Sequence, residues 1–210
     1  DAQQAIEFDQ DLANNDLGRV HIKSVYDFAG IDVTEQGIAV LADPTQTPIA
    51  DRPVRFLRVV KAVSIPTREV RDFDNSAFGR SRNQLMREII GYVPIEPDGS
   101  VLFDVPANVP LAFSVLDEKG KRVSARHQNW LQFAPGEVRT CNGCHRQDNE
   151  APHGRADAEV ESINVGAANT GSPFLNTNPT LFADLGDTMA QTSGRINGIN
   201  YPSPDINFTD

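Results

Sequence analysis

The two cysteines of this 210-residue chain stand three positions apart and are followed directly by a histidine. The motif is Cys141-Asn142-Gly143-Cys144-His145, and C-x-x-C-H is the sequence signature of c-type haem attachment. Two intervening residues let both sulfurs reach the vinyl groups on one edge of the porphyrin, where they form thioethers. The adjacent histidine then lies beneath the iron and donates an imidazole nitrogen as the proximal ligand. We therefore predict one covalent haem c, held by Cys141, Cys144 and His145.

Three other uses of the motif fit the sequence less well. A thioredoxin-like dithiol stands at a helix N-terminus after a β-strand, in a βαβ setting that the flanking sequences PGEVRT and RQDNEAPHG do not resemble. A structural zinc site needs four ligands, usually in two pairs, and the chain has no second cysteine pair. Its other histidines are His21, His127 and His153. A disulfide across C-x-x-C would leave the histidine of the motif unexplained.

Haem attachment also predicts the compartment, because cytochrome c maturation takes place on the outer side of the energy-transducing membrane. We expect a bacterial periplasm or cell surface, in line with the lack of other thiols. No stretch approaches the roughly 20 apolar residues that span a bilayer. From the polar start DAQQAIEFDQDLANND and the abrupt end INFTD we expect either a mature chain or an excised piece, which can be part of a larger polypeptide.

The charge of the chain is acidic and unevenly distributed. A formal net charge of −10 argues against nucleic acid and anionic membrane surfaces as partners, since both need a positive footprint. Residues 52–87 contain nine Lys or Arg against three acids, whereas the residues after 155 contain seven acids and one arginine. Such polarity can orient a charged redox partner; the alternative is an ordinary solvated surface.

Alternating apolar residues predict a mainly β chain. The turn-like sequences Glu96-Pro97-Asp98-Gly99 and Asp117-Glu118-Lys119-Gly120 each separate two apolar runs. Strands at a spacing of about ten residues with such turns are typical of an antiparallel β-sandwich. The predicted strands cover residues 20–26, 37–41, 56–65, 89–95, 101–105 and 111–116.

Two regions follow from this pattern. We expect a β-sandwich-like region over residues 1–125 and a haem c-binding segment over residues 126–210. Helices are predicted near residues 83–88 and from residue 179 or 180 to 193, and the chain beyond residue 152 is expected to be mostly loop over the haem. The two regions are expected to form one integrated domain.

Two resemblances support this organisation. The run VPIEPDGSVLFDVPANVPLAFSVLDEKGKRV, residues 93–123, looks like the small β-sandwiches of the prealbumin and carboxypeptidase-regulatory type. The longer span from residue 91 to residue 145, which ends in NWLQFAPGEVRTCNGCH, resembles the middle domain of the hydrazine synthase alpha subunit and its bacterial relatives. That resemblance implies a haem domain within a larger secreted redox protein. It does not bring the hydrazine chemistry with it, because that chemistry needs further haem sites and this chain has one C-x-x-C-H.

The sixth iron ligand decides what such a haem can do. His127 is the first candidate, because a short PGE turn joins its segment RHQNWLQ to the motif, so both should border one pocket. Met189 is the second, at a spacing similar to that of small class I cytochromes, and a vacant sixth position is the third. His21, His153 and Met86 are weaker candidates.

Other side chains are expected around the haem. Trp130 and Phe133 can pack against its face or belong to the core. The basic residues Arg126, Arg139 and Arg146 can pair with the propionates.

Two functional classes remain open. The first is a monohaem electron-transfer domain whose redox partner is another protein or haem domain. The second is an open-site haem that binds or turns over peroxide, NO or O₂, with Arg126, Gln128 or Asn129 facing the vacancy. A haem that mainly stabilises a loop-rich fold is compatible with either. No other catalytic motif is present, and no metal beyond iron is predicted.

Overall fold

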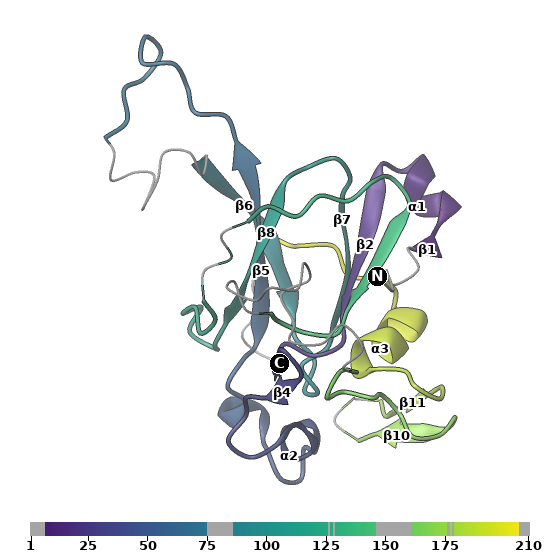
Figure 1. Ribbon diagram of the computed structural model, residues 1–210. Helices are drawn as coiled ribbons and strands as arrows, with labels where there is room; N and C mark the ends of the chain where they lie inside the picture. Colours follow the sequence, from purple (N-terminus) through teal and green to yellow (C-terminus); the bar gives the residue numbers. More distant parts are fainter. Residues whose placement is uncertain are drawn as a thin grey trace.

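The chain folds as a mainly β protein with several small sheets and few helices (Figure 1). The computed structural model describes residues 7–74, 86–125, 127, 129–145, 161–175, 177 and 179–205. The strands are β1 (Glu7–Phe8), β2 (Leu17–Ile22), β3 (Asp27–Phe28), β4 (Ile31–Asp32), β5 (Phe56–Val63), β6 (Met86–Pro94), β7 (Val101–Pro106), β8 (Leu111–Leu116), β9 (Glu137–Cys141), β10 (Ser172–Phe174) and β11 (Leu181–Ala183). The helices are α1 (Gln10–Asn14), α2 (Ile38–Ala42), the 3₁₀ turn η1 (Ile49–Asp51) and α3 (Met189–Asn197).

Two larger sheets form the body of the molecule. One has the order β1-β9-β2-β7 and the other the order β6-β5-β8, and two-stranded sheets join β3 with β4 and β10 with β11. All pairings are antiparallel except that of β2 with β9, which run parallel. The purely antiparallel arrangement that the sequence predicts is therefore wrong at one pair, because β9 enters the sheet after a long connection rather than a hairpin.

The apolar faces of the two larger sheets contribute to one core. On β7, Val101, Phe103 and Val105 are buried and alternate with more accessible residues, as the period of two requires. The ring of Phe103 meets that of Phe113 from β8 edge to face, with centroids 5.6 Å apart. The other fully buried core members from these strands and the loop before β9 are Val20, Leu57, Val59, Val93, Leu111 and Phe133.

The turns predicted from the sequence are confirmed. Gly99 has φ of 79° and donates its N–H to the carbonyl of Glu96, while Gly120 has φ of 73° and donates to Asp117. Both glycines stand where a left-handed backbone is needed, which a residue with a Cβ adopts only with strain. These turns connect β6 to β7 and lead out of β8.

Helical and extended segments differ from the predictions at three places. Residues 38–42 form the short helix α2 instead of a strand, because a brief apolar run does not distinguish the two by its period. The helix expected at 83–88 is contradicted at its end, where residues 86–88 open β6; residues 83–85 lie outside the described part. The last helix starts at Met189 and not near 180, since Thr188 and Gln191 form a capping box and residues 181–183 pair with β10.

The turn between β6 and β7 fastens α3 to the sheets. The carboxylate of Asp98 accepts hydrogen bonds from the Met189 N–H at 3.0 Å and from the Asn164 amide at 2.9 Å. It also accepts from the backbone N–H and the hydroxyl of Ser100, at 2.9 and 2.6 Å. The Ser100 hydroxyl in turn accepts from the Ala190 N–H at 2.9 Å. Orphan donors at the start of the helix are thereby satisfied by a buried acidic turn.

Candidate functional site

Cys141 is placed by a strand that adds to the main sheet. β9 lies between β1 and β2, and Cys141 is its last residue, opposite Ile22 in the parallel register. The N–H of Lys23 donates to the carbonyl of Cys141 at 2.8 Å, which extends the pairing beyond β2. The motif thus begins at the end of a paired strand.

Cys144 is held by the loop that contains β3. Its N–H donates to the carbonyl of Asp27 at 2.7 Å, and its own carbonyl accepts from the N–H of Ala29 at 2.9 Å. The buried carboxylate of Asp27 accepts from the N–H groups of Gly30 at 2.7 Å and Ile163 at 3.1 Å. Asp27 therefore joins the motif to two other segments, and its role was missed by the sequence analysis.

Gly143 fits this contact because it has no side chain. A Cβ at this position would lie 2.5 Å from both the carbonyl oxygen and the Cβ of Asp27. Separations this short force the backbone to shift, so the motif can approach Asp27 only with glycine here. The glycine was the signal in the sequence that pointed to a close backbone approach.

Both thiols are free and partly buried. Burial raises the pKa of Cys141, and burial together with the nearby charge of Asp27 raises the pKa of Cys144 to about 11. Reactive redox thiols have a lowered pKa, because the thiolate is the attacking form. These two thiols are therefore protonated at neutral pH, unlike those of a thioredoxin-like dithiol. Within the described residues, no three His, Cys, Asp or Glu side chains are grouped to hold a metal ion.

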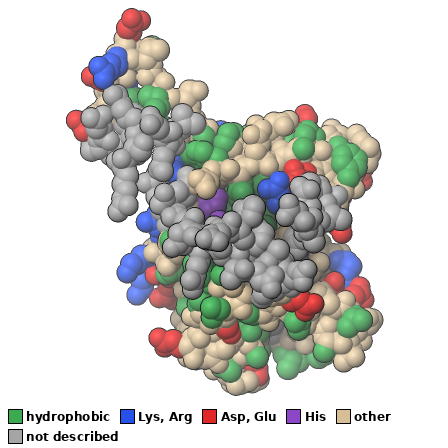
Figure 2. All heavy atoms as spheres, viewed as in Figure 1, with side chains coloured by type: hydrophobic (Ala, Val, Ile, Leu, Met, Phe, Trp, Pro, Cys, Tyr) green, Lys and Arg blue, Asp and Glu red, His purple; other side chains and the backbone are tan. Residues whose placement is uncertain are grey.

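The structure brings His127 next to His145. The two rings have centroids 6.4 Å apart and planes at 85°, and the His127 ring is stacked on Phe113 at 6.4 Å and 19°. His127 is half-buried and His145 exposed. Figure 2 shows histidine side chains at the surface near hydrophobic and basic side chains.

The surroundings of His127 favour its neutral form, which can donate a nitrogen lone pair to a metal. Burial lowers its pKa, and the charges of His145 and Arg87 lower it further. Its Nδ1 is buried and has no hydrogen-bond partner among the residues that the structure describes. A buried imidazole nitrogen in this condition costs stability unless something binds it.

Arg87 and Trp130 support the backbone of His127. The guanidinium of Arg87 donates to the carbonyl of His127 at 3.1 Å and stands 4.6 Å from the centre of the Trp130 ring. Trp130 thus lies against the guanidinium that binds the backbone of His127; its expected packing against a haem stays a prediction. Among the described residues of this neighbourhood, Arg87 was not recognised from the sequence, where it is one basic residue in a basic stretch.

Some of the remaining candidates have described positions, and the others lie outside the described residues. Phe133 is a core residue at 1% exposure, and Arg139 pairs with Glu137 while its guanidinium lies 4.7 Å from the centre of the Phe133 ring. Met189 is buried at the start of α3, and Met86 is the first residue of β6. The positions of Arg126, Gln128, Arg146 and His153 lie outside the described residues.

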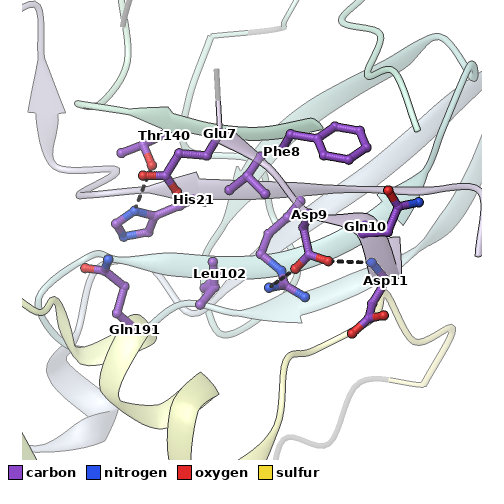
Figure 3. Close-up of a pocket in the computed structure, with 11 residues that line it drawn as sticks. Glu7, Phe8, Asp9, Gln10, Asp11, His21, Leu102, Thr140 and Gln191 are labelled. Carbon is purple, nitrogen blue, oxygen red and sulfur yellow. Dashed lines mark hydrogen bonds and ion pairs between the residues drawn. The ribbon is translucent and has the colours of Figure 1, made fainter. Parts of the chain in front are cut away.

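His21 lies on β2 beside a separate pocket of about 440 Å³ (Figure 3). Its Nε2 is 3.0 Å from the Thr188 hydroxyl, and its Nδ1 is 3.4 Å from the hydroxyl of Thr140, toward which the ring points in Figure 3. Burial lowers the pKa of His21 to about 4, with Lys23 adding to the effect. His21 is thus a buried histidine with both ring nitrogens near hydroxyl groups.

Comparison with known proteins shows that part of the chain is similar to a protein family. Residues 52–146 match the hydrazine synthase alpha subunit middle domain. This part of the chain is related to that family, and it includes β5 to β9 and the whole C-x-x-C-H motif. The motif cysteines thus lie within the part of the chain that is similar to this family.

Two relatives carry the same name. Hydrazine synthase subunit alpha of Kuenenia stuttgartiensis is 39% identical over 59 residues, which is 28% of this chain and 7% of that protein. The solved structure of Kuenenia stuttgartiensis hydrazine synthase has a TM-score of 0.43 at 19% identity, covering 69% of this chain and 20% of that one. The chain spans a small part of these relatives. Within the described residues, no helix is long and apolar enough to cross a membrane.

Proposed function

We propose that this chain is a monohaem c-type cytochrome domain that transfers electrons outside the cytoplasm, in a bacterial periplasm or at the cell surface. Cys141 and Cys144 would form the thioether links, and His145 and His127 would be the two iron ligands. The observation that carries the proposal is the position of the His127 ring beside His145, because 18 residues of sequence separate the two and only the fold brings them together.

The residues present fit this group. Imidazole nitrogens bind metals at about 2 Å, so two rings that would hold one metal between them would have centroids about 6 Å apart. The 6.4 Å between the rings of His127 and His145 agrees with that separation. The buried Nδ1 of His127, which has no partner among the described residues, and the two free cysteines are further groups that the haem would use or shield.

Each residue then has a defined task. A haem supplies one-electron chemistry at its iron, and two axial ligands favour outer-sphere transfer over substrate binding. Asp27 orients the second cysteine through its backbone carbonyl, and Gly143 allows that approach. Arg87 and Trp130 hold the backbone of His127 in place. Bis-histidine ligation would give a lower potential than histidine with methionine.

The surroundings of the domain are also part of the proposal. We take the two larger sheets around one core as the β-sandwich that the sequence predicts, with the motif at the end of its added strand. The match to a subunit named for hydrazine synthase supports a place within a larger redox protein or complex, whose other haem domains or partner proteins would exchange electrons with this one.

The test is the visible spectrum of the full chain, produced in a host that matures cytochromes c. We expect one haem per chain that stays attached after denaturation, and sharp low-spin bands in both oxidation states that do not change with CO. His127→Ala should become high-spin and bind CO, whereas the matched variant Met189→Leu should keep the wild-type spectrum.

Each alternative has its own outcome. High-spin bands and ready CO binding in the wild type would replace electron transfer by an open-site haem that binds a small molecule. If Met189→Leu and not His127→Ala opens the iron, the second ligand is Met189. A chain without covalent haem in that host would refute the proposal.

A further inference from the structure

A pocket lined by three arginines lies on the sheet β6-β5-β8. It has a volume of about 270 Å³ and is lined by Arg58 and Val60 of β5, Arg87 of β6, Ser114 of β8 and Arg122. Arg58 and Ser114 are opposite each other in the β5–β8 register. Arg58 and Val60 are two positions apart on β5 and therefore lie on the same face of the sheet. The core residues Leu57 and Val59 lie on the opposite face.

The positive charge of this pocket is poorly compensated by the chain itself. Within the described residues, Arg58 and Arg122 have no ion pair with an acidic side chain, although the chain as a whole has an excess of acids. The Nε of Arg58 is buried and has no hydrogen-bond partner in that part of the chain. A buried guanidinium donor without an acceptor costs free energy, which a bound anion would recover.

The shape and chemistry of the pocket select a small oxyanion. A guanidinium offers parallel N–H donors that match the two oxygens of a carboxylate, and three of them around about 270 Å³ leave room for a small planar group. Arg87 also connects the pocket to the candidate site, because its guanidinium donates to the carbonyl of His127 at 3.1 Å. Arg87 therefore links the pocket to the backbone of the second histidine of the proposed haem site, although Ser114 and Phe113, on which the His127 ring is stacked, are successive residues on opposite faces of β8.

We propose that Arg58, Arg87 and Arg122 form a binding site for a carboxylate. Two sources share this chemistry. One is a propionate of the haem, which rests on the proposed function; the other is a free small carboxylate, which does not. In the first case, the propionate would pair with Arg58 and its neighbours and not with Arg139, whose guanidinium is paired with Glu137.

The test uses the full chain as purified, with haem content read independently from its visible spectrum. Acetate is titrated at constant ionic strength while the Nε–H signal of Arg58 is followed by NMR, and the midpoint potential is measured by spectroelectrochemistry. The variants are Arg58→Gln and Arg58→Lys. The lysine variant keeps the positive charge but loses the two parallel N–H donors of the guanidinium. The matched control is Arg68→Gln, whose side chain is 74% exposed and lies outside the pocket.

A free carboxylate predicts a saturable acetate shift in the wild type and in Arg68→Gln, with binding weakened roughly 10-fold or more in Arg58→Gln. A propionate predicts no acetate binding to the haem-loaded protein. It also predicts a midpoint potential that falls in Arg58→Gln more than in Arg68→Gln, because an uncompensated propionate favours the oxidised iron, and Arg58→Lys should lie between them. No saturable shift and no difference in potential between the Arg58 variants and Arg68→Gln would overturn the site. A chain without haem that still binds acetate would refute only the proposed function.

Discussion

Replacing Asp98 by alanine should be one of the most destabilising single substitutions in this chain. The Asp98 carboxylate is buried and accepts four hydrogen bonds, from Ser100 twice, from Asn164 and from the N–H of Met189. Asn164 also donates to the carbonyl of Lys23. One side chain therefore connects the β6–β7 turn, the segment around residue 164, and the start of α3.

The magnitude follows from these contacts. Four hydrogen bonds, at the ordinary net value of about 1 kcal/mol each, give a loss of about 4 kcal/mol on removal of the carboxylate. Burial raises the pKa of Asp98, so its removal also ends a burial cost and its repulsion of Glu96, which offsets part of this loss. We therefore expect Asp98→Ala to lower the free energy of unfolding by about 3 kcal/mol, a large share of the typical total.

The other hairpin supplies the matched control. Asp117 begins that turn, and its carboxylate accepts from the N–H groups of Lys119 at 2.9 Å and Lys121 at 2.8 Å, both in an exposed setting. Asp117→Ala should cost about 1 kcal/mol or less, because water replaces the lost acceptor. Urea denaturation at pH 7, followed by far-UV circular dichroism, measures both variants. Equal losses, within about 0.5 kcal/mol, would refute the argument that Asp98 holds three segments together.

Three further predictions concern pH, the motif and α3. Burial and the charge of Asp98 raise the pKa of Glu96 to about 7, so its contribution to stability is present at low pH and is lost as the pH rises from about 4.5 to 7. His21, whose pKa is lowered to about 4, has the opposite effect, since its contribution to stability is lost as the pH falls from 6.5 to 4. In urea titrations, Glu96→Gln should therefore make the free energy of unfolding fall more steeply as the pH goes from 7 to 5. A dependence of this free energy on pH equal to that of the wild type would contradict the prediction. Gly143→Ala should reduce stability and the yield of the proposed covalent haem, because the added Cβ meets the backbone of Asp27, and an unchanged yield would contradict this. Thr188→Ala should cost about 2 kcal/mol in thermal unfolding, as it removes both a helix cap and the partner of His21, and a loss no larger than that of an exposed cap would argue against the His21 contact.

Local patterns explain which predictions the sequence supported. The alternation over residues 101–105 and 111–116 predicted β7 and β8, because burial on one face of a strand imposes a period of two. Gly99 and Gly120 predicted their turns, since a left-handed backbone favours glycine. The helix-or-strand error at residues 38–42 and the late start of α3 arose where the local signal is ambiguous and long-range pairing decides the outcome.

The sequence by itself determined the motif on which the proposed function rests, because Cys141, Cys144 and His145 lie within five residues and their spacing needs no fold to be recognised. Only the tertiary structure decided which distant groups join them. Asp27 reaches Cys144 through a backbone contact, and β9 pairs in parallel with a strand more than a hundred residues earlier in the chain. The physical reason is that backbone hydrogen bonds carry no residue-specific signal, so the pairing of remote segments depends on the packing of the whole core. His127 was inferred from a short turn, but its place beside His145 rests on the stacking of its ring on Phe113, a contact between side chains that the sequence alone does not specify.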